Sequence, residues 1–173
     1  MSDTLVTIVA IALAAILMFV FPLMTMSDRT DDVSQLTVET ATTEFVDEIR
    51  TTGKITEDKY SKFIEAIGST GNTYNVEMEV QILDENPGKK TTQTDRTKIG
   101  ENVYYSVYTS QIEEKLEDEG VYKLKEGDIV SVSVKNTNQT LSQQLKNFFY
   151  TVVGNDTYTI AASHGGIVSA TGK

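Results

Sequence analysis

The sequence holds few side chains of the types that perform acid–base or nucleophilic chemistry. His164 is the one histidine, and Ser163 and Asp156 lie near it, which supplies the residue types of a Ser-His-Asp arrangement. Neighbouring residues on a strand point to opposite faces, however, and a nucleophile and its base normally come from separate segments. We therefore expect His164 to be a surface residue of a turn with Gly165 and Gly166.

A metal site would have to be built from carboxylates, because the chain has 1 His and 0 Cys. Glu77 and Glu79 share one face of a predicted strand, which favours the solvated side of a sheet over a catalytic dyad. Acids also crowd a predicted helix end, where they oppose the helix dipole and could attract a cation: Glu113, Glu114, Glu117, Asp118 and Glu119.

The sequence contains no Gly-rich phosphate loop after a strand and no nucleotide, haem or zinc motif. We therefore predict that the protein is not an enzyme and has no catalytic residue, cofactor or metal. The 25 Asp and Glu against 15 Lys and Arg give a net charge of −10, which repels phosphate backbones and argues against nucleic-acid binding. The 173 residues allow one domain and an anchor.

The candidate anchor is an apolar run from Leu5 to Met26, with no charge between Asp3 and Asp28. As a helix it would be roughly 33 Å long, enough to span a bilayer core. A cleaved signal peptide would need a basic start and a small-x-small cleavage site, whereas this run begins after MSDT and ends in bulky residues. We predict a retained transmembrane anchor over residues 1–27, with Pro22 either tolerated near the membrane interface or marking a segment that can unwind.

Charges flanking the run give almost no orientation bias, because Asp3 lies on one side and Arg29 stands among aspartates on the other. A long polar tail after a single anchor usually ends up outside. We expect a single-pass protein of the cell membrane with most of the chain extracellular.

The helical pattern continues beyond the anchor. Val38, Ala41, Phe45 and Ile49 keep a three-to-four spacing up to Gly53, a residue that commonly ends helices. Residues 28–53 are therefore predicted to be a helical stalk. One helix would run from about residue 4 to 52, apolar all round in its first half and amphipathic in its second.

Residues 54–173 are predicted to form a small antiparallel sheet with short helices. Thr56 caps a helix with an apolar face of Tyr60, Phe63, Ile64 and Ile67. The clearest strand is 74–82, where apolar and polar residues alternate, and a second strand is expected at 129–135. A long polar loop, Asn86–Gly100, comes after the first of these strands.

The remaining elements are less regular in pattern. Tyr105, Tyr108, Ile112 and Leu116 fit a helix, although 104–108 also fits a strand. A helix beginning at Asn138 or Thr140 carries apolar residues, and a last hairpin joins strands at 157–163 and 167–170 through 164–166. The fold class is α+β, with a long N-terminal transmembrane helix that continues into the sheet domain. The apolar residues of the late helix are Leu141, Leu145, Phe148 and Phe149.

The architecture resembles that of type IV pilin-like proteins, especially the pseudopilin-like proteins of tight-adherence (Tad) pilus systems. The resemblance rests on the apolar run ending in Phe21–Met24, its helical continuation to Gly53, and the segment from Gly53 to Val80. The run Leu5–Met26 lacks the glutamate that pilins carry, and Asp3 is not assigned that role.

Such a resemblance implies a structural subunit of a pilus or pilus-like secretion or conjugation apparatus, located in the membrane or in an extracellular filament. Its partners would be other copies or related pilin subunits, membrane lipid, an assembly ATPase and a polytopic platform protein. Ala10, Ala12, Ala14 and Ala15 are small enough for close helix packing. The predicted membrane and assembly residues are Leu5, Ile8, Ala12, Ala15, Phe19, Pro22, Val38, Ala41, Phe45 and Ile49.

The alternative is a monomeric, membrane-tethered extracellular binding module, such as an adhesin or a sensor domain. Its ligand would contact the loop Asn86–Gly100 or the tyrosine-rich segment Tyr104–Tyr108. A filament subunit should leave an apolar stripe uncovered between residues 33 and 49, whereas a tethered module should cover it.

Overall fold

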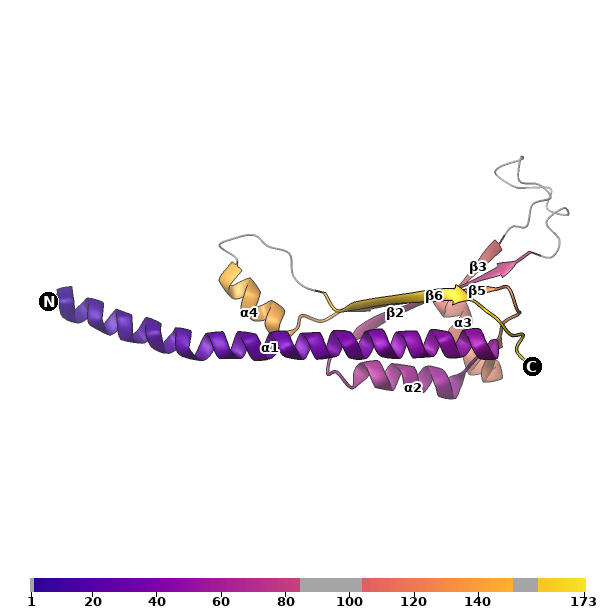
Figure 1. Cartoon of the computed structure of the whole chain (residues 1–173), viewed down its shortest axis with the longest axis horizontal. Helices are drawn as coiled ribbons and strands as arrows, with labels where there is room; N and C mark the ends of the chain where they lie inside the picture. Colours follow the sequence, from indigo (N-terminus) through magenta and orange to yellow (C-terminus); the bar gives the residue numbers. More distant parts are fainter. Residues whose placement is uncertain (1, 85–103, 151–158) are drawn as a thin grey trace, which may run out of the picture.

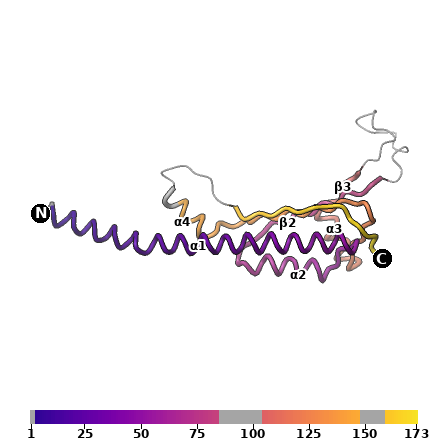
Figure 2. The backbone as a smooth tube through the Cα atoms, viewed as in Figure 1, coloured from indigo at the N-terminus to yellow at the C-terminus, as the bar shows by residue number. Residues whose placement is uncertain are grey.

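The computed structural model describes residues 2–84, 104–150 and 159–173, with the backbone alone for residues 2 and 148–150. The predicted long helix is α1 (Ser2–Thr52), an unbroken α-helix of 51 residues with Pro22 inside it. It is about 75 Å long. Figure 1 shows the sheet, α2 and α3 lying along the C-terminal half of α1 and α4 near its middle, so that the N-terminal part projects beyond the rest of the protein. Figure 2 shows that this projecting half is gently curved.

Gly53 ends α1 as the sequence predicts, with a φ of +65° and its N–H bonded to the Ile49 carbonyl at 2.8 Å. A Cβ at this position would lie 2.1 Å from the Ala170 carbonyl oxygen. Glycine is therefore required both for the backbone conformation and for the close approach of the C-terminal segment.

The main sheet has four antiparallel strands in the order β3–β2–β5–β6. The strands are β2 (Tyr74–Leu83), β3 (Tyr104–Tyr108), β5 (Ile129–Asn136) and β6 (Ala161–Ile167). On β2 and β5 apolar and polar residues alternate as predicted: Met78, Val80, Val130 and Val132 are buried, while Glu77 faces solvent on the other side. This alternation is typical of a sheet with one face on a core and one face in water.

The core lies between that sheet, α1 and α2 (Glu57–Gly68). Thr56 caps α2 by accepting a hydrogen bond from the Lys59 N–H at 3.4 Å. Phe63 on α2 stacks on Phe45 of α1, with ring centroids 4.5 Å apart and planes 3° from parallel. Ile49, Val46 and Val38 of α1 are buried against the sheet side of this core.

Two helices and two short strands complete the described fold. α3 (Thr109–Glu119) ends at Gly120, and α4 (Leu141–Tyr150) follows Thr140. The short strands β1 (Lys54–Thr56) and β4 (Val121–Lys123) pair with each other, and the sequence did not predict them. Of the alternatives for 104–108, the strand is confirmed, and the helix begins only at Thr109.

The predicted C-terminal hairpin is wrong. His164, Gly165 and Gly166 lie inside the continuous strand β6, and do not form a turn. The glycines allow close packing instead: a Cβ at Gly166 would lie 2.6 Å from Arg50 Nε, and one at Gly165 would lie 3.0 Å from the Val130 carbonyl oxygen. The predicted loop 86–100 and residues 157–158 lie outside the described part of the chain.

Candidate functional site

The N-terminal half of α1 is the largest uncovered apolar surface in the described structure. One helix there is long and apolar enough to cross a membrane, and the protein's own domain covers none of that segment. The predicted residues of the anchor lie on this bare stretch: Leu5, Ile8 and Phe19 are 64%, 63% and 76% exposed, and Ala12, Ala15 and Pro22 are also exposed.

The predicted residues of the stalk have a different environment. Val38, Phe45 and Ile49 are buried, and Ala41 is half-buried against the same core. They fix the domain on α1 and do not face outward. On α1 beyond Met26, the large apolar side chains left exposed are Val33 and Leu36, at 65% and 64%.

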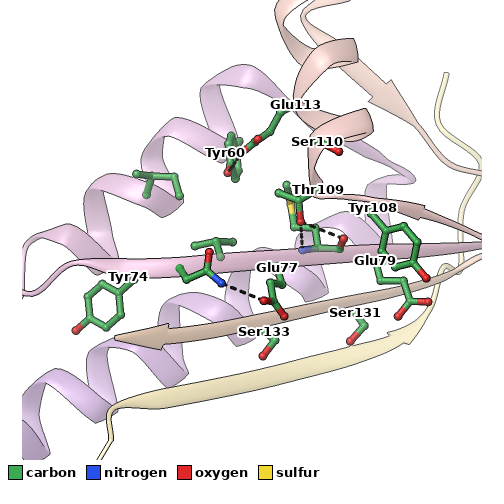
Figure 3. Close-up of a pocket in the computed structure, with 14 residues that line it drawn as sticks. Tyr60, Tyr74, Glu77, Glu79, Tyr108, Thr109, Ser110, Glu113, Ser131 and Ser133 are labelled. Carbon is green, nitrogen blue, oxygen red and sulfur yellow. Dashed lines mark hydrogen bonds between the residues drawn. The ribbon is translucent and has the colours of Figure 1, made fainter. Parts of the chain in front are cut away.

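A second candidate site is a hollow of about 700 Å³ beside β2. Figure 3 shows its lining: Tyr60 comes from α2, Thr109 and Glu113 from α3, and Glu77 and Glu79 from β2. Its floor is the first half of β2 and its walls are the two helices. Acidic and tyrosine side chains from both sides of β2 therefore line one depression.

The edge of β2 is open along this hollow. β3 pairs with β2 only from Glu79 to Leu83, so the described chain places no strand beside residues 74–77 on that edge. At Met78 the Thr109 side chain replaces a strand, because its hydroxyl accepts from the Met78 N–H at 2.7 Å and lies 3.3 Å from the Met78 carbonyl. By the two-residue strand period, the backbone groups of Tyr74 and Val76 point to the same edge.

Hydrogen bonds hold the carboxylates of the hollow in place. Tyr60 donates to Glu113 at 2.6 Å, and burial followed by this bond raises the Tyr60 pKa well above its usual range. Ser106 donates to Glu79 at 2.6 Å, which lowers the Glu79 pKa. Carboxyl groups held by hydrogen bonds beside an open strand edge suit a cationic, extended ligand.

A third cluster joins α1 to α4 just beyond the apolar run. Asp28 accepts from Ser142 and forms an ion pair with Lys146 at 2.7 Å. Asp31, 5% exposed, accepts from the Thr140 hydroxyl at 2.7 Å. The bonds from Lys146 and Ser142 lower the Asp28 pKa, whereas burial raises the Asp31 pKa. We call these contacts the α1–α4 junction.

His164 lies elsewhere than predicted. It is not on a surface turn: its side chain lies on the sheet face that packs on α1, with Nε2 3.5 Å from the Asp47 carboxylate. Ser163 is on the opposite face of β6, so the structure separates these residues as strand geometry requires. Asp156 lies outside the described residues. Within the described ranges, no group of His, Asp or Glu side chains is clustered closely enough to hold a metal ion.

Sequence reasoning missed the hollow. Its strand and helices were predicted separately, and nothing in the spacing indicated that Tyr60, Thr109 and Glu113 would meet at one edge of β2. The tyrosine-rich segment was singled out, and Tyr108 does line the hollow with 59% of its surface exposed.

Comparison of the chain with family models, curated proteins and solved structures found no match.

Proposed function

We propose that the protein is a structural subunit of a pilus or pilus-like apparatus, assembled through side-by-side packing of its N-terminal helix with other subunits. The observation that carries the proposal is the division of α1. Its apolar first half is left bare, while its second half is the spine of the folded domain. A bare apolar helix on a rigid domain can be held in lipid before assembly and packed against other helices after it.

Residues beyond the anchor extend this proposed assembly surface. Met26, Val33 and Leu36 lie on the side of α1 that faces away from the sheet, and all are more than half exposed. Thr40 continues that side without charge. Arg29 is the charged residue on this side, between Met26 and Val33. An exposed stripe above the membrane that carries Val33 and Leu36 would let the helices of adjacent copies remain in contact after they leave the bilayer.

The buried residues of α1 are not part of this proposed assembly surface. Val38, Phe45 and Ile49 face the subunit's own core, so they would position the domain and would not contact a neighbour. The proposed assembly residues are therefore those of the bare half of α1 together with Val33 and Leu36.

The test is immunogold electron microscopy of material sheared from the cells that make the protein. Wild-type chain should label filaments, and the Leu36→Asp variant should reduce labelling while the protein stays in the membrane fraction. Ser163→Asp, which adds the same charge on the exposed outer face of β6, is the matched control and should leave labelling unchanged. Sheared filaments without label would sink the proposal.

A tethered binding module is the second candidate, favoured by the hollow and by the burial of Val38, Phe45 and Ile49. It would take an extended, basic segment that pairs with the edge of β2 at Tyr74 and Val76 and meets Glu77 and Glu113. Fluorescence anisotropy with a labelled lysine-containing strand peptide tests it. The Glu113→Gln variant should bind the peptide more weakly, whereas Glu126→Gln, at a distant turn, should not change binding.

A further inference from the structure

α4 packs on α1 through its polar side, the reverse of an ordinary surface helix. Ser142 and Gln143 are buried, and Lys146 reaches Asp28. By contrast Leu141 is 53% exposed and Leu145 is only half-buried. The helical period puts positions 141, 145 and 148 on one side of the helix, and the sequence has Leu, Leu and Phe there.

Hydrogen bonds between polar groups attach the N-terminal end of α4 to α1. Thr140 and Gln143 exchange hydrogen bonds as a capping box, with the Thr140 N–H donating to Gln143 Oε1 at 3.0 Å and the Gln143 N–H donating to the Thr140 hydroxyl at 3.2 Å. Thr140 then bonds Asp31, and Ser142 bonds Asp28. The side of α4 that faces the protein is therefore fixed by polar groups, which leaves its apolar side turned away from α1.

The position of α4 along α1 identifies what covers that apolar side. Asp28 and Asp31 follow Met26, the last residue of the apolar run, by about 3 Å and about 8 Å of helix. Figure 1 shows α4 leaving α1 at this level and pointing toward the projecting N-terminal half. If α1 spans a bilayer, α4 lies at the surface where the hydrocarbon begins.

We propose that α4 is a second membrane contact, an interfacial helix that rests its apolar side on the lipid while its polar side is held by Asp28 and Asp31 of α1. Short amphipathic helices in this position sink their apolar side roughly 5–10 Å into the headgroup and acyl boundary. The contact depends on apolar burial and not on charge, because Lys146 is already paired and the junction is otherwise acidic. It would fix the rotation of the domain relative to the membrane, and it does not depend on filament assembly.

Tryptophan fluorescence of the full chain tests this, because the sequence contains 0 Trp and any introduced Trp is a unique reporter. Leu141→Trp would be placed in single-copy nanodiscs of phosphatidylcholine with bromine on the acyl chains. Ile16→Trp reports the middle of the apolar run, and Leu36→Trp reports an exposed site on α1 roughly 15 Å beyond Met26.

Leu141→Trp should lose emission to lipids brominated near the headgroup, to an extent comparable with the loss of Ile16→Trp to lipids brominated near the chain end. Leu36→Trp should keep its emission. Exchanging part of the lipid for an anionic one should not increase the quenching of Leu141→Trp.

An unquenched Leu141→Trp beside a quenched Ile16→Trp would overturn the proposal while leaving the anchor intact. In that case Leu141→Cys in multi-copy vesicles would show what covers the helix, since the chain has 0 Cys. A disulfide cross-link between copies would assign the apolar side of α4 to a second subunit. Quenching that requires anionic lipid would also contradict contact through apolar burial.

Discussion

One stripe of α1 meets the domain in two chemically different ways. From Val38 to Ile49 the stripe is apolar and buried under the sheet and α2. From Ser27 to Ser34 the same side of the helix is polar: Ser27, Asp31 and Ser34 are buried, and α4 is bonded to Asp31 and to the partly exposed Asp28. Apolar burial is not directional and gives most of the stability, whereas hydrogen-bonded polar contacts give little net stability but a defined geometry. The apolar contact from Val38 to Ile49 therefore holds the domain on α1, and the α1–α4 junction sets the direction of α4.

The largest expected effect tests the apolar contact. Ile49→Ala removes a fully buried side chain and should lower the free energy of unfolding by about 2–5 kcal/mol. Urea unfolding of the full chain in detergent micelles, followed by circular dichroism, measures it. Leu36→Ala, at a residue 64% exposed on the same helix, should change that free energy by no more than about 0.5 kcal/mol. Equal losses in the two variants would show that the sheet does not hold α1 through this stripe.

The next largest loss of stability is expected from a substitution at Gly53, directly after the last residue of α1. Gly53→Ala forces a side chain into a positive φ and against the Ala170 carbonyl, which it would approach to 2.1 Å. Gly71→Ala is the matched control, because its φ is +77° and nothing lies within 4 Å of the new Cβ. The control should cost about 1–2 kcal/mol from backbone strain alone. Gly53→Ala should cost clearly more in the same unfolding experiment, and a cost no larger than that of Gly71→Ala would contradict the close packing.

A smaller effect is expected at the α1–α4 junction. Asp28→Asn removes the ion pair with Lys146. The Asp28 side chain is 43% exposed and the Lys146 side chain 29%, so solvent screens much of their attraction. The expected loss of about 0.2–1 kcal/mol should appear as local opening, with α4 backbone amides exchanging hydrogen up to roughly fivefold faster. Asp118→Asn removes a charge from an exposed residue of α3, which lies far from α4 (Figure 1), and should leave the exchange unchanged. Slower exchange in Asp28→Asn would contradict the stabilising role of this pair.

The smallest effect has the opposite sign. The Asp31 carboxylate is buried with a raised pKa, so its ionised form destabilises the junction above that pKa and the penalty is relieved as pH falls through it. Asp28, with a lowered pKa, stabilises the junction above the unfolded-state value, and this contribution is lost as pH falls through the folded-state value. Protection of α4 amides should therefore rise slightly and then fall during acidification. Asp31→Asn keeps an acceptor for Thr140 and should abolish the initial rise.

The sequence predicted the elements of the apolar contact better than it predicted the sites. The alternation in 74–82 and the spacing of Val38, Phe45 and Ile49 each report burial of one face, so the helix, the strand and the helix stop at Gly53 are local properties of the chain. The wrong hairpin at His164 came from the same local reasoning. Its two glycines resemble a turn, but they serve contacts with Arg50 and Val130, which are distant in sequence.

The α1–α4 junction and the hollow were not predictable in this way. Asp28 and Asp31 match ordinary solvated acids near a membrane interface, and only the fold brings Ser142 and Thr140 to them. Likewise, the open edge of β2 depends on where β3 stops and on how Thr109 is placed beside Met78. Contacts of this kind depend on tertiary placement, which hydrophobic periodicity does not encode.

The close packing at Gly53 also has a mechanical consequence. Ser169 N–H bonds the Arg50 carbonyl at 2.8 Å, Leu124 N–H bonds the Gly53 carbonyl at 2.8 Å, and Gly172 N–H bonds the Leu124 carbonyl at 2.9 Å. The segment 169–172 is thereby attached to the end of α1 that lies farthest from the apolar run. A pulling force applied between the bilayer and this segment would be transmitted along the axis of α1 and through these bonds. Little of the tension would cross the sheet. Under such a load the sheet domain would keep its fold, because α1 and the bonds at its end would carry the tension.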